Sequence, residues 1–320
     1  MRDSRIELYR CLLTWGIVFL HVVGFYAAGA MRLSSAFAWC VPGFIFITGY
    51  FGCKFSWKKV LKIYGVALWC YPVTIAIRNL VLGGAWSPLT YGRDVYEAFL
   101  GNWFIHAYVG LMMLAPLIDG ALARLKETKR LQDAGVVVPF LLFVFGWSFL
   151  SNFNCMHRFL PVVPSCSVLT LLGTYTVARI IRFCEIDLRI HPWQAAALFC
   201  VGIALSLLRI GSFNSVVALM ITIGAFALIR RVTISNRVEK VFLWMAPSMF
   251  SVFLLHATPW CLQSLKGWVD KLASYGVPLH LAFIVVTTAV FVAGFILDLP
   301  RRVFVRFIIG RVEMEKGRKV

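Results

Sequence analysis

The chain has 320 residues, of which 60% are hydrophobic and 14% are charged, and its mean hydropathy is +0.81. These values exclude an ordinary soluble globular domain and indicate an integral membrane protein. The formal net charge of +18 does not indicate nucleic-acid binding, because the basic residues form short clusters between apolar runs.

Ten apolar stretches are candidates for membrane spans, since a helix needs about 20 such residues to cross the hydrocarbon layer. We therefore expect an all-α fold, a polytopic membrane helical bundle of about ten transmembrane helices. The loops are too short to bury a core of their own, so residues 1–320 are predicted to form one domain. The predicted spans are 9–28, 36–53, 60–82, 102–122, 135–151, 164–182, 193–209, 212–229, 241–262 and 279–299.

The distribution of lysine and arginine predicts the orientation of these spans. Of the 32 basic residues, 25 fall on one side of the ten-span topology and six on the other, while Arg78 lies within the third span. Positively charged residues stay on the cytoplasmic side. We therefore expect a multi-pass protein of the inner (cytoplasmic) membrane with both termini in the cytoplasm.

The first span carries a polar stripe. Arg10 and His21 are eleven residues apart, which on a helix is three turns plus about 20°, or about 16 Å along the axis. Glu7 and Thr14 lie near the same line. A polar stripe that faced lipid would be costly, so we expect it to face the bundle. The structural alternative makes Glu7 and Arg10 headgroup-level anchors and His21 a hydrogen-bonded interior histidine.

Four motifs resemble the acyltransferase 3 family of membrane proteins, in the same order along the chain. The first is the spacing of Arg10 and His21, which matches the arginine and histidine of the family's first helix. The four segments are "RIELYRCLLTWGIVFLH" (5–21), "FIFITGYF" (44–51), "GNWFIHAYVGLMMLAPLI" (101–118) and "SMFSVFLLH" (248–256).

The chain departs from the family pattern at a few positions. Thr48 replaces the usual serine of the second motif, and Phe253 replaces the usual tyrosine of the fourth. Lys59 and Lys62 stand where relatives often carry Arg-x-x-Arg. Positive charge is kept there, but the bidentate geometry of guanidinium is lost. An equally supported interpretation makes both lysines positive-inside anchors.

The resemblance implies transfer of an acyl group, usually acetyl, from cytoplasmic acyl-CoA to a hydroxyl of a cell-envelope polysaccharide or lipid-linked glycan. His21 would act as a general base or as a transient acyl carrier, because an acceptor hydroxyl has a pKa far above 7. Arg10, with Lys59 and Lys62, would bind the phosphates of acetyl-CoA or another acyl-CoA. The expected partners are the lipid bilayer and the glycan acceptor. Glu7 is expected to pair with Arg10.

Other polar and aromatic residues are weaker candidates for acceptor binding. Tyr50 and Trp103 would stack on a sugar or serve as interfacial aromatics, and His106 and His256 would line the acceptor site or make structural hydrogen bonds. The nine cysteines show no metal-site spacing, so no metal is expected. Cys155 and Cys166, which flank one outer loop, would pair if that side is oxidising, and most of the other cysteines are expected to be buried free thiols.

Two other function classes compete with an acyltransferase. A transporter or flippase of a lipid-linked sugar would use the polar stripe as a path, but no internal repeat or paired broken helix is visible in the sequence. A non-catalytic membrane scaffold or sensor would need neither Arg10 nor His21.

Overall fold

The computed structural model describes residues 3–24, 26, 31–82, 87–133, 135–139, 168–208 and 215–317, and these residues form helices without strands. The first half contains α1 (Ser4–Gly24), α2 (Met31–Ser35), α3 (Cys40–Phe51), α4 (Trp57–Leu82), α5 (Pro88–Gly101), α6 (Trp103–Glu127) and η2 (Arg130–Gln132). The second half contains α9 (Val168–Phe183), α10 (Ile186–Arg189), α11 (Pro192–Leu207), α12 (Val216–Ile229), α13 (Asn236–Met245), η3 (Ala246–Ser248), α14 (Met249–His256), α15 (Pro259–Ser274) and α16 (Leu279–Gly317).

Among the described residues, six segments are long and apolar enough to cross a membrane, and two shorter apolar helices accompany them. The all-helical membrane fold is therefore confirmed, while the full set of ten spans stays a prediction. Most of the predicted span 135–151, like Cys155 and Cys166, lies outside the described residues. The six segments are Ser4–Gly24, Arg32–Phe51, Trp57–Val81, Trp103–Glu127, Asn236–His256 and Leu279–Phe307, and the shorter helices are α11 and α12.

The stretch predicted as one span over 241–262 is divided in the structure. α13 passes through the 3-10 turn η3 into α14, which ends at His256, and Pro259 then begins α15. Proline has no backbone N–H and its ring clashes with the preceding turn, so Pro247 and Pro259 lie at the two junctions. The division places His256 at the end of a helix rather than inside one.

Two segments predicted as outer loops are helices. α5 follows α4 and is fastened to it by an ion pair between Arg78 and Asp94 and by the Tyr91 hydroxyl, which donates to the Pro72 carbonyl at 2.9 Å. α15 packs along α16 through Cys261, Leu265 and other apolar residues. Arg78, placed in the third span by its sequence, is thus paired with a carboxylate.

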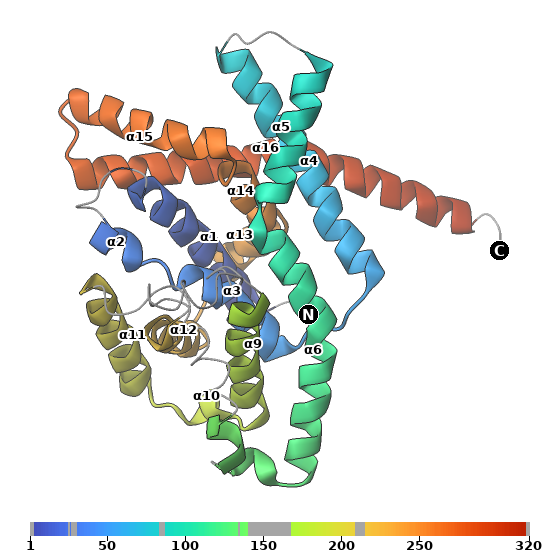
Figure 1. Ribbon diagram of the computed structural model, residues 1–320, viewed down its shortest axis with the longest axis vertical. Helices are drawn as coiled ribbons and strands as arrows, with labels where there is room; N and C mark the ends of the chain where they lie inside the picture. Colours follow the sequence, from blue (N-terminus) through green and yellow to red (C-terminus); the bar gives the residue numbers. More distant parts are fainter. Residues whose placement is uncertain are drawn as a thin grey trace, which may run out of the picture.

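α1 contributes to two hydrophobic cores, and it lies between α15 and α3 (Figure 1). Its Val18 and Val22 belong to a core with α14, α15 and α16, whereas Leu13 and Ile17 belong to a core with α3, α9 and α12. All four side chains are at most 3% exposed. A helix that is apolar on most faces is buried by its neighbours, and this burial fixes the direction of its polar stripe.

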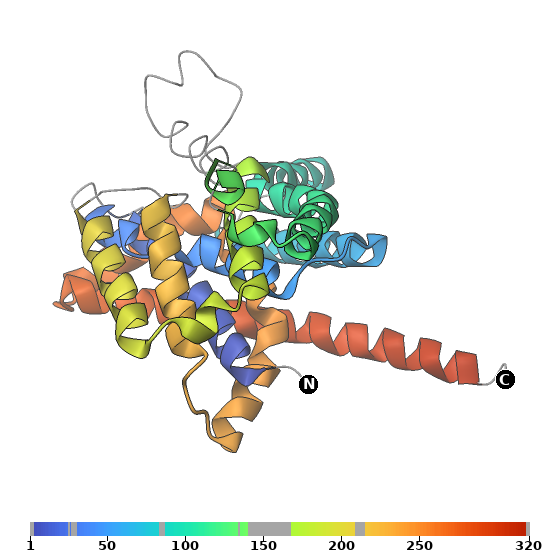
Figure 2. The same cartoon turned by 90° about the horizontal axis from the view of Figure 1, so that it is seen from below.

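α3 and α9 approach closely because α3 has a glycine at the crossing. A Cβ atom on Gly49 would lie 2.5 Å from the Tyr175 carbonyl oxygen and 2.8 Å from the Ala178 Cβ. Small residues allow helix backbones to approach in this way in membrane proteins. α16 is the longest helix, with 39 residues, and its C-terminal part extends beyond the other helices (Figure 2).

Candidate functional site

His21 on α1 and His256 on α14 are in direct contact. Their nitrogens Nδ1 and Nε2 are 2.9 Å apart, and their ring centroids are 5.1 Å apart. His256 is 2% exposed and His21 is half-buried. The sequence identified both histidines separately, and the fold brings them together across 235 positions of the chain.

The hydrogen bonds of His256 determine where the protons lie on two neutral rings. Its Nδ1 is 2.8 Å from the carbonyl oxygen of Val252, which only accepts hydrogen bonds. His256 Nδ1 therefore carries the proton, and its Nε2 accepts the hydrogen bond from His21 Nδ1–H. The remaining nitrogen, His21 Nε2, keeps its lone pair. This is the arrangement of a base whose tautomer and orientation are fixed by a second group.

The polar stripe of α1 faces the interior, as expected. Glu7 is 3% and Thr14 is 0% exposed. Arg10 Nη1 donates to both Glu7 carboxylate oxygens at 2.9 and 3.0 Å, and the Thr14 hydroxyl donates to the Arg10 carbonyl at 2.9 Å. The ion pair confirms the expectation for Glu7 and leaves the guanidinium half-buried beside a cavity.

That cavity has a volume of about 530 Å³ and is formed by α1, α3, α4, α6, α14, α16 and η3. Arg10, Lys59 and Lys62, predicted together as donor-binding residues, all line it, and so does Arg301, which the sequence did not identify. Most of the remaining wall is apolar: Ile17, Val41, Phe44, Ile47, Phe51, Ile63, Val66, Phe104, Met112, Ala246, Pro247, Met249, Phe250 and Phe253.

The histidine pair lies one helical turn beyond this cavity. Ile17 and Phe253 line the cavity four residues before His21 and three residues before His256. The Phe253 ring packs against Phe104 at 5.2 Å and against His256 at 5.9 Å between centroids. Phe253 thus lines the basic cavity and also contacts one of the two histidines.

A hydroxyl pair inside the cavity also escaped the sequence-based prediction. The Thr48 and Tyr108 oxygens are 3.3 Å apart, and the Thr48 hydroxyl donates to the Phe44 carbonyl at 3.1 Å. Tyr108 therefore donates to Thr48. Thr48 belongs to the second motif of the family resemblance and Tyr108 to the third. The tyrosine of the third motif, five residues after Trp103, was therefore the sequence signal that could have identified this pair.

The turn after α3 is fixed by a polar network on α6 and α9. Gly52 has a φ of 78°, and the backbone N–H of Cys53 donates to the Tyr175 hydroxyl at 3.1 Å. Tyr175 and Arg179 in turn donate to Asp119 Oδ1 at 3.0 and 2.8 Å. Because Gly52 and Cys53 line the cavity, this network shapes its wall next to Lys59.

Trp103 and His106 lie at the junction of α5 and α6 and do not line this cavity within the described residues. His106 Nε2 lies 3.1 Å from the Phe99 carbonyl, and the Trp103 ring packs against Phe104 at 5.7 Å. Asn102 caps α6 by accepting from the Ile105 N–H at 3.4 Å. A role of Trp103 and His106 in acceptor binding stays a prediction.

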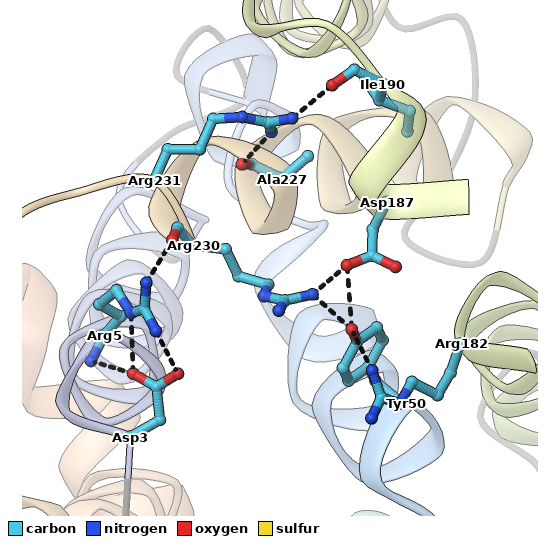
Figure 3. A network of polar contacts seen from close by, with 9 residues as sticks. All are labelled: Asp3, Arg5, Tyr50, Arg182, Asp187, Ile190, Ala227, Arg230 and Arg231. Carbon is cyan, nitrogen blue, oxygen red and sulfur yellow. Dashed lines mark hydrogen bonds and ion pairs between the residues drawn. The ribbon is translucent and has the colours of Figure 1, made fainter. Parts of the chain in front are cut away.

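Tyr50 belongs to a separate polar cluster (Figure 3). It is 2% exposed, and its hydroxyl donates to Asp187 at 2.9 Å and accepts from Arg182 at 3.2 Å and from Arg230. Arg230 also pairs with Asp187. These bonds tie α3 to α9, α10 and α12. The hydroxyl is engaged within the protein, and a role of Tyr50 in acceptor binding stays a prediction.

Arg5 connects the same cluster to the start of α1. Its Nη1 donates to the Arg230 carbonyl at 2.8 Å, and its other nitrogens bind the Asp3 carboxylate at 3.0 Å (Figure 3). These hydrogen bonds from Arg5 hold the pKa of Asp3 below its usual range. The cluster therefore fixes the end of α1 that also carries Arg10.

The described residues contain no group of three or more histidine, cysteine or acidic side chains arranged for a metal ion, and their cysteines are free. Comparison with known proteins identifies a family. A family model described as an acyltransferase domain matches residues 3–299, nearly the whole chain. No curated protein and no solved structure matches.

Proposed function

The chain belongs to the acyltransferase 3 family, and from this premise we propose that it is a membrane O-acetyltransferase. It would transfer acetyl from cytoplasmic acetyl-CoA to a hydroxyl of a cell-envelope polysaccharide or lipid-linked glycan. The observation that carries the proposal is the hydrogen-bonded pair of His21 and His256, one turn beyond a cavity that Arg10, Lys59 and Lys62 line.

His21 acts as the general base in this proposal. Its Nε2 takes the proton of the acceptor hydroxyl while the acceptor oxygen attacks the thioester carbonyl. A carbon–oxygen bond forms, the carbon–sulfur bond breaks, and the proton from His21 passes to the departing thiolate. His256 holds the His21 ring in the tautomer that keeps Nε2 free. Covalent acyl transfer through His21 would use the same nitrogen.

The cavity suits the donor in its charge and its apolar lining. Its volume of about 530 Å³ falls within the usual range for small-molecule sites. Arg10, Lys59 and Lys62 supply positive charge for the CoA phosphates, and the apolar wall suits the pantetheine arm. The thioester then lies toward Ile17 and Phe253, so the Phe253 side chain must turn aside before the acyl carbon reaches His21.

An assay with purified protein tests the reaction. Radiolabelled acetyl-CoA is incubated with a panel of envelope polysaccharides and lipid-linked glycans, and alkali-labile label on the glycan is counted. The proposal predicts label on at least one acceptor, together with stoichiometric free CoA. A transporter would instead move a lipid-linked sugar across the membrane of proteoliposomes without CoA. Such transport, together with the absence of labelled glycan, would overturn the proposal.

A further inference from the structure

A second arginine lines the basic part of the cavity, beyond the end of the family match. The match ends at residue 299, whereas α16 continues through Pro300 to Gly317. Arg301 lines the cavity together with Arg10, Lys59 and Lys62, and its side chain is 11% exposed. Four cationic side chains from α1, α4 and α16 thus converge on one cavity.

A buried carboxylate orients Arg301. Asp298, one turn earlier on α16, is 0% exposed. It accepts from Arg301 Nε at 2.6 Å and from Nη2 at 2.9 Å, and Nη2 also approaches the Pro247 carbonyl at 3.4 Å. One edge of the guanidinium is therefore fixed by the protein. Its Nη1 donates no hydrogen bond to the described residues.

The neighbouring Arg302 serves a different purpose. It is 8% exposed, donates to the Ser248 hydroxyl at 3.3 Å and lies over the Trp244 ring at 5.3 Å and the Phe295 ring at 5.9 Å. It does not line the cavity. Successive side chains on a helix point about 100° apart, so only Arg301 of this pair reaches the cavity.

We propose that Arg301 binds a phosphate group of the acyl donor and that Asp298 is its positioning residue. The inference rests on the proposed function, because it takes the donor to be acyl-CoA. Lys59 and Lys62 provide charge without a planar donor set, and Arg10 already binds Glu7 through Nη1. Arg301 adds a guanidinium with a fixed orientation and a free Nη1, which suits a phosphate oxygen.

Binding measurements on the full chain test this assignment. Isothermal titration with CoA, 3′-dephospho-CoA and pantetheine compares the wild type with Arg301→Gln and with Arg306→Gln. Arg306 is exposed on the same helix and does not line the cavity, so its variant loses the same charge. Arg301→Gln is expected to weaken CoA binding about tenfold or more and to leave pantetheine binding unchanged.

Two further variants separate positioning from charge. Asp298→Asn keeps Arg301 but loosens its orientation, so it should weaken CoA binding less than Arg301→Gln does. Arg301→Lys keeps the charge and should restore only part of the affinity for CoA. This variant is used in place of Arg301→Gln if the Gln variant does not fold. Equal CoA affinities for the Arg301 variants, Arg306→Gln and the wild type would overturn the assignment. A wild type that binds no CoA would instead contradict the proposed donor.

Discussion

At the scale of single residues, the proposed role of His21 as a general base depends on a hydrogen bond that His21 donates to His256. His256 accepts this bond because its own proton is committed to the Val252 carbonyl at 2.8 Å. Without an acceptor at this position, the His21 ring is free to rotate and to place its proton on Nε2. The base would then present N–H instead of a lone pair to the acceptor hydroxyl.

Substitution of His256 tests this dependence. His256→Leu removes the acceptor and should lower kcat about a hundredfold, a typical contribution of a positioned general base. His256→Gln keeps a side-chain acceptor oxygen and should retain more of the activity. The measurement is steady-state transfer at saturating acetyl-CoA. Equal activity of the Leu and Gln variants would contradict a role in fixing the tautomer.

The two routes through His21 also differ in a measurable way. Wild-type protein incubated with radiolabelled acetyl-CoA and no acceptor should carry no covalent label after rapid denaturation at neutral pH, because a general base never bonds to the acyl group. His21→Ala provides the background level. Label present on the wild type and absent from His21→Ala would instead identify His21 as an acyl carrier.

At the scale of elements, close helix packing positions the cavity wall. Gly49 lets α3 approach α9, and a Cβ there would lie 2.5 Å from a backbone oxygen that has no freedom to move away. Thr48 and Gly52, on either side of Gly49, both line the cavity. A change in the α3–α9 distance therefore changes the site as well as the stability.

A matched pair of glycine variants tests this packing. Gly49→Ala should lower stability by about 1–3 kcal/mol, the usual cost of overpacking. Gly65→Ala adds the same methyl group on α4, where nothing lies within 4 Å of the new Cβ, and should keep or raise stability, because alanine favours a helix interior more than glycine does. The apparent midpoint of thermal unfolding in detergent is the measurement. Equal midpoints for the two variants would contradict the close α3–α9 approach.

Sequence periodicity predicted the elements better than their junctions. The apolar runs gave α1, α4, α6 and the membrane part of α16 within a few residues, because hydrophobic length alone determines such helices. The apolar runs did not predict the junction of α13 with α14, which contains Pro247, or the separation of α14 from α15, where Pro259 begins the second helix. The amphipathic helices α5 and α15 were also missed, since transmembrane hydropathy does not detect them.

At the scale of the whole molecule, residues distant in sequence assemble the site. The positions of Arg10 and His21 on one helix face were predictable from helical geometry. The contact between His21 and His256 and the entry of Arg301 into the cavity depend on how α1, α14 and α16 pack. No local sequence pattern encodes this packing. His256 was assigned to a motif only through the family resemblance.

The orientation of the molecule in the membrane is a further prediction. Residues 279 and 301 are 22 steps apart on α16, about 33 Å, which matches the hydrocarbon thickness. With Cys155, Cys166, Cys184 and Cys200 replaced by serine, a membrane-impermeant maleimide should label Tyr275→Cys in intact cells. It should label Arg306→Cys only after permeabilisation. The reverse pattern would place the basic cavity on the outer side and exclude cytoplasmic acetyl-CoA.

The central claim is that His21 carries out acyl transfer to an envelope glycan. The most direct measurement is the acetyl-ester content of envelope glycans, by mass spectrometry, in cells that produce wild-type protein or His21→Ala at equal membrane levels. We expect acetyl ester with the wild type and its loss with His21→Ala. An unchanged ester content in the variant would contradict the account.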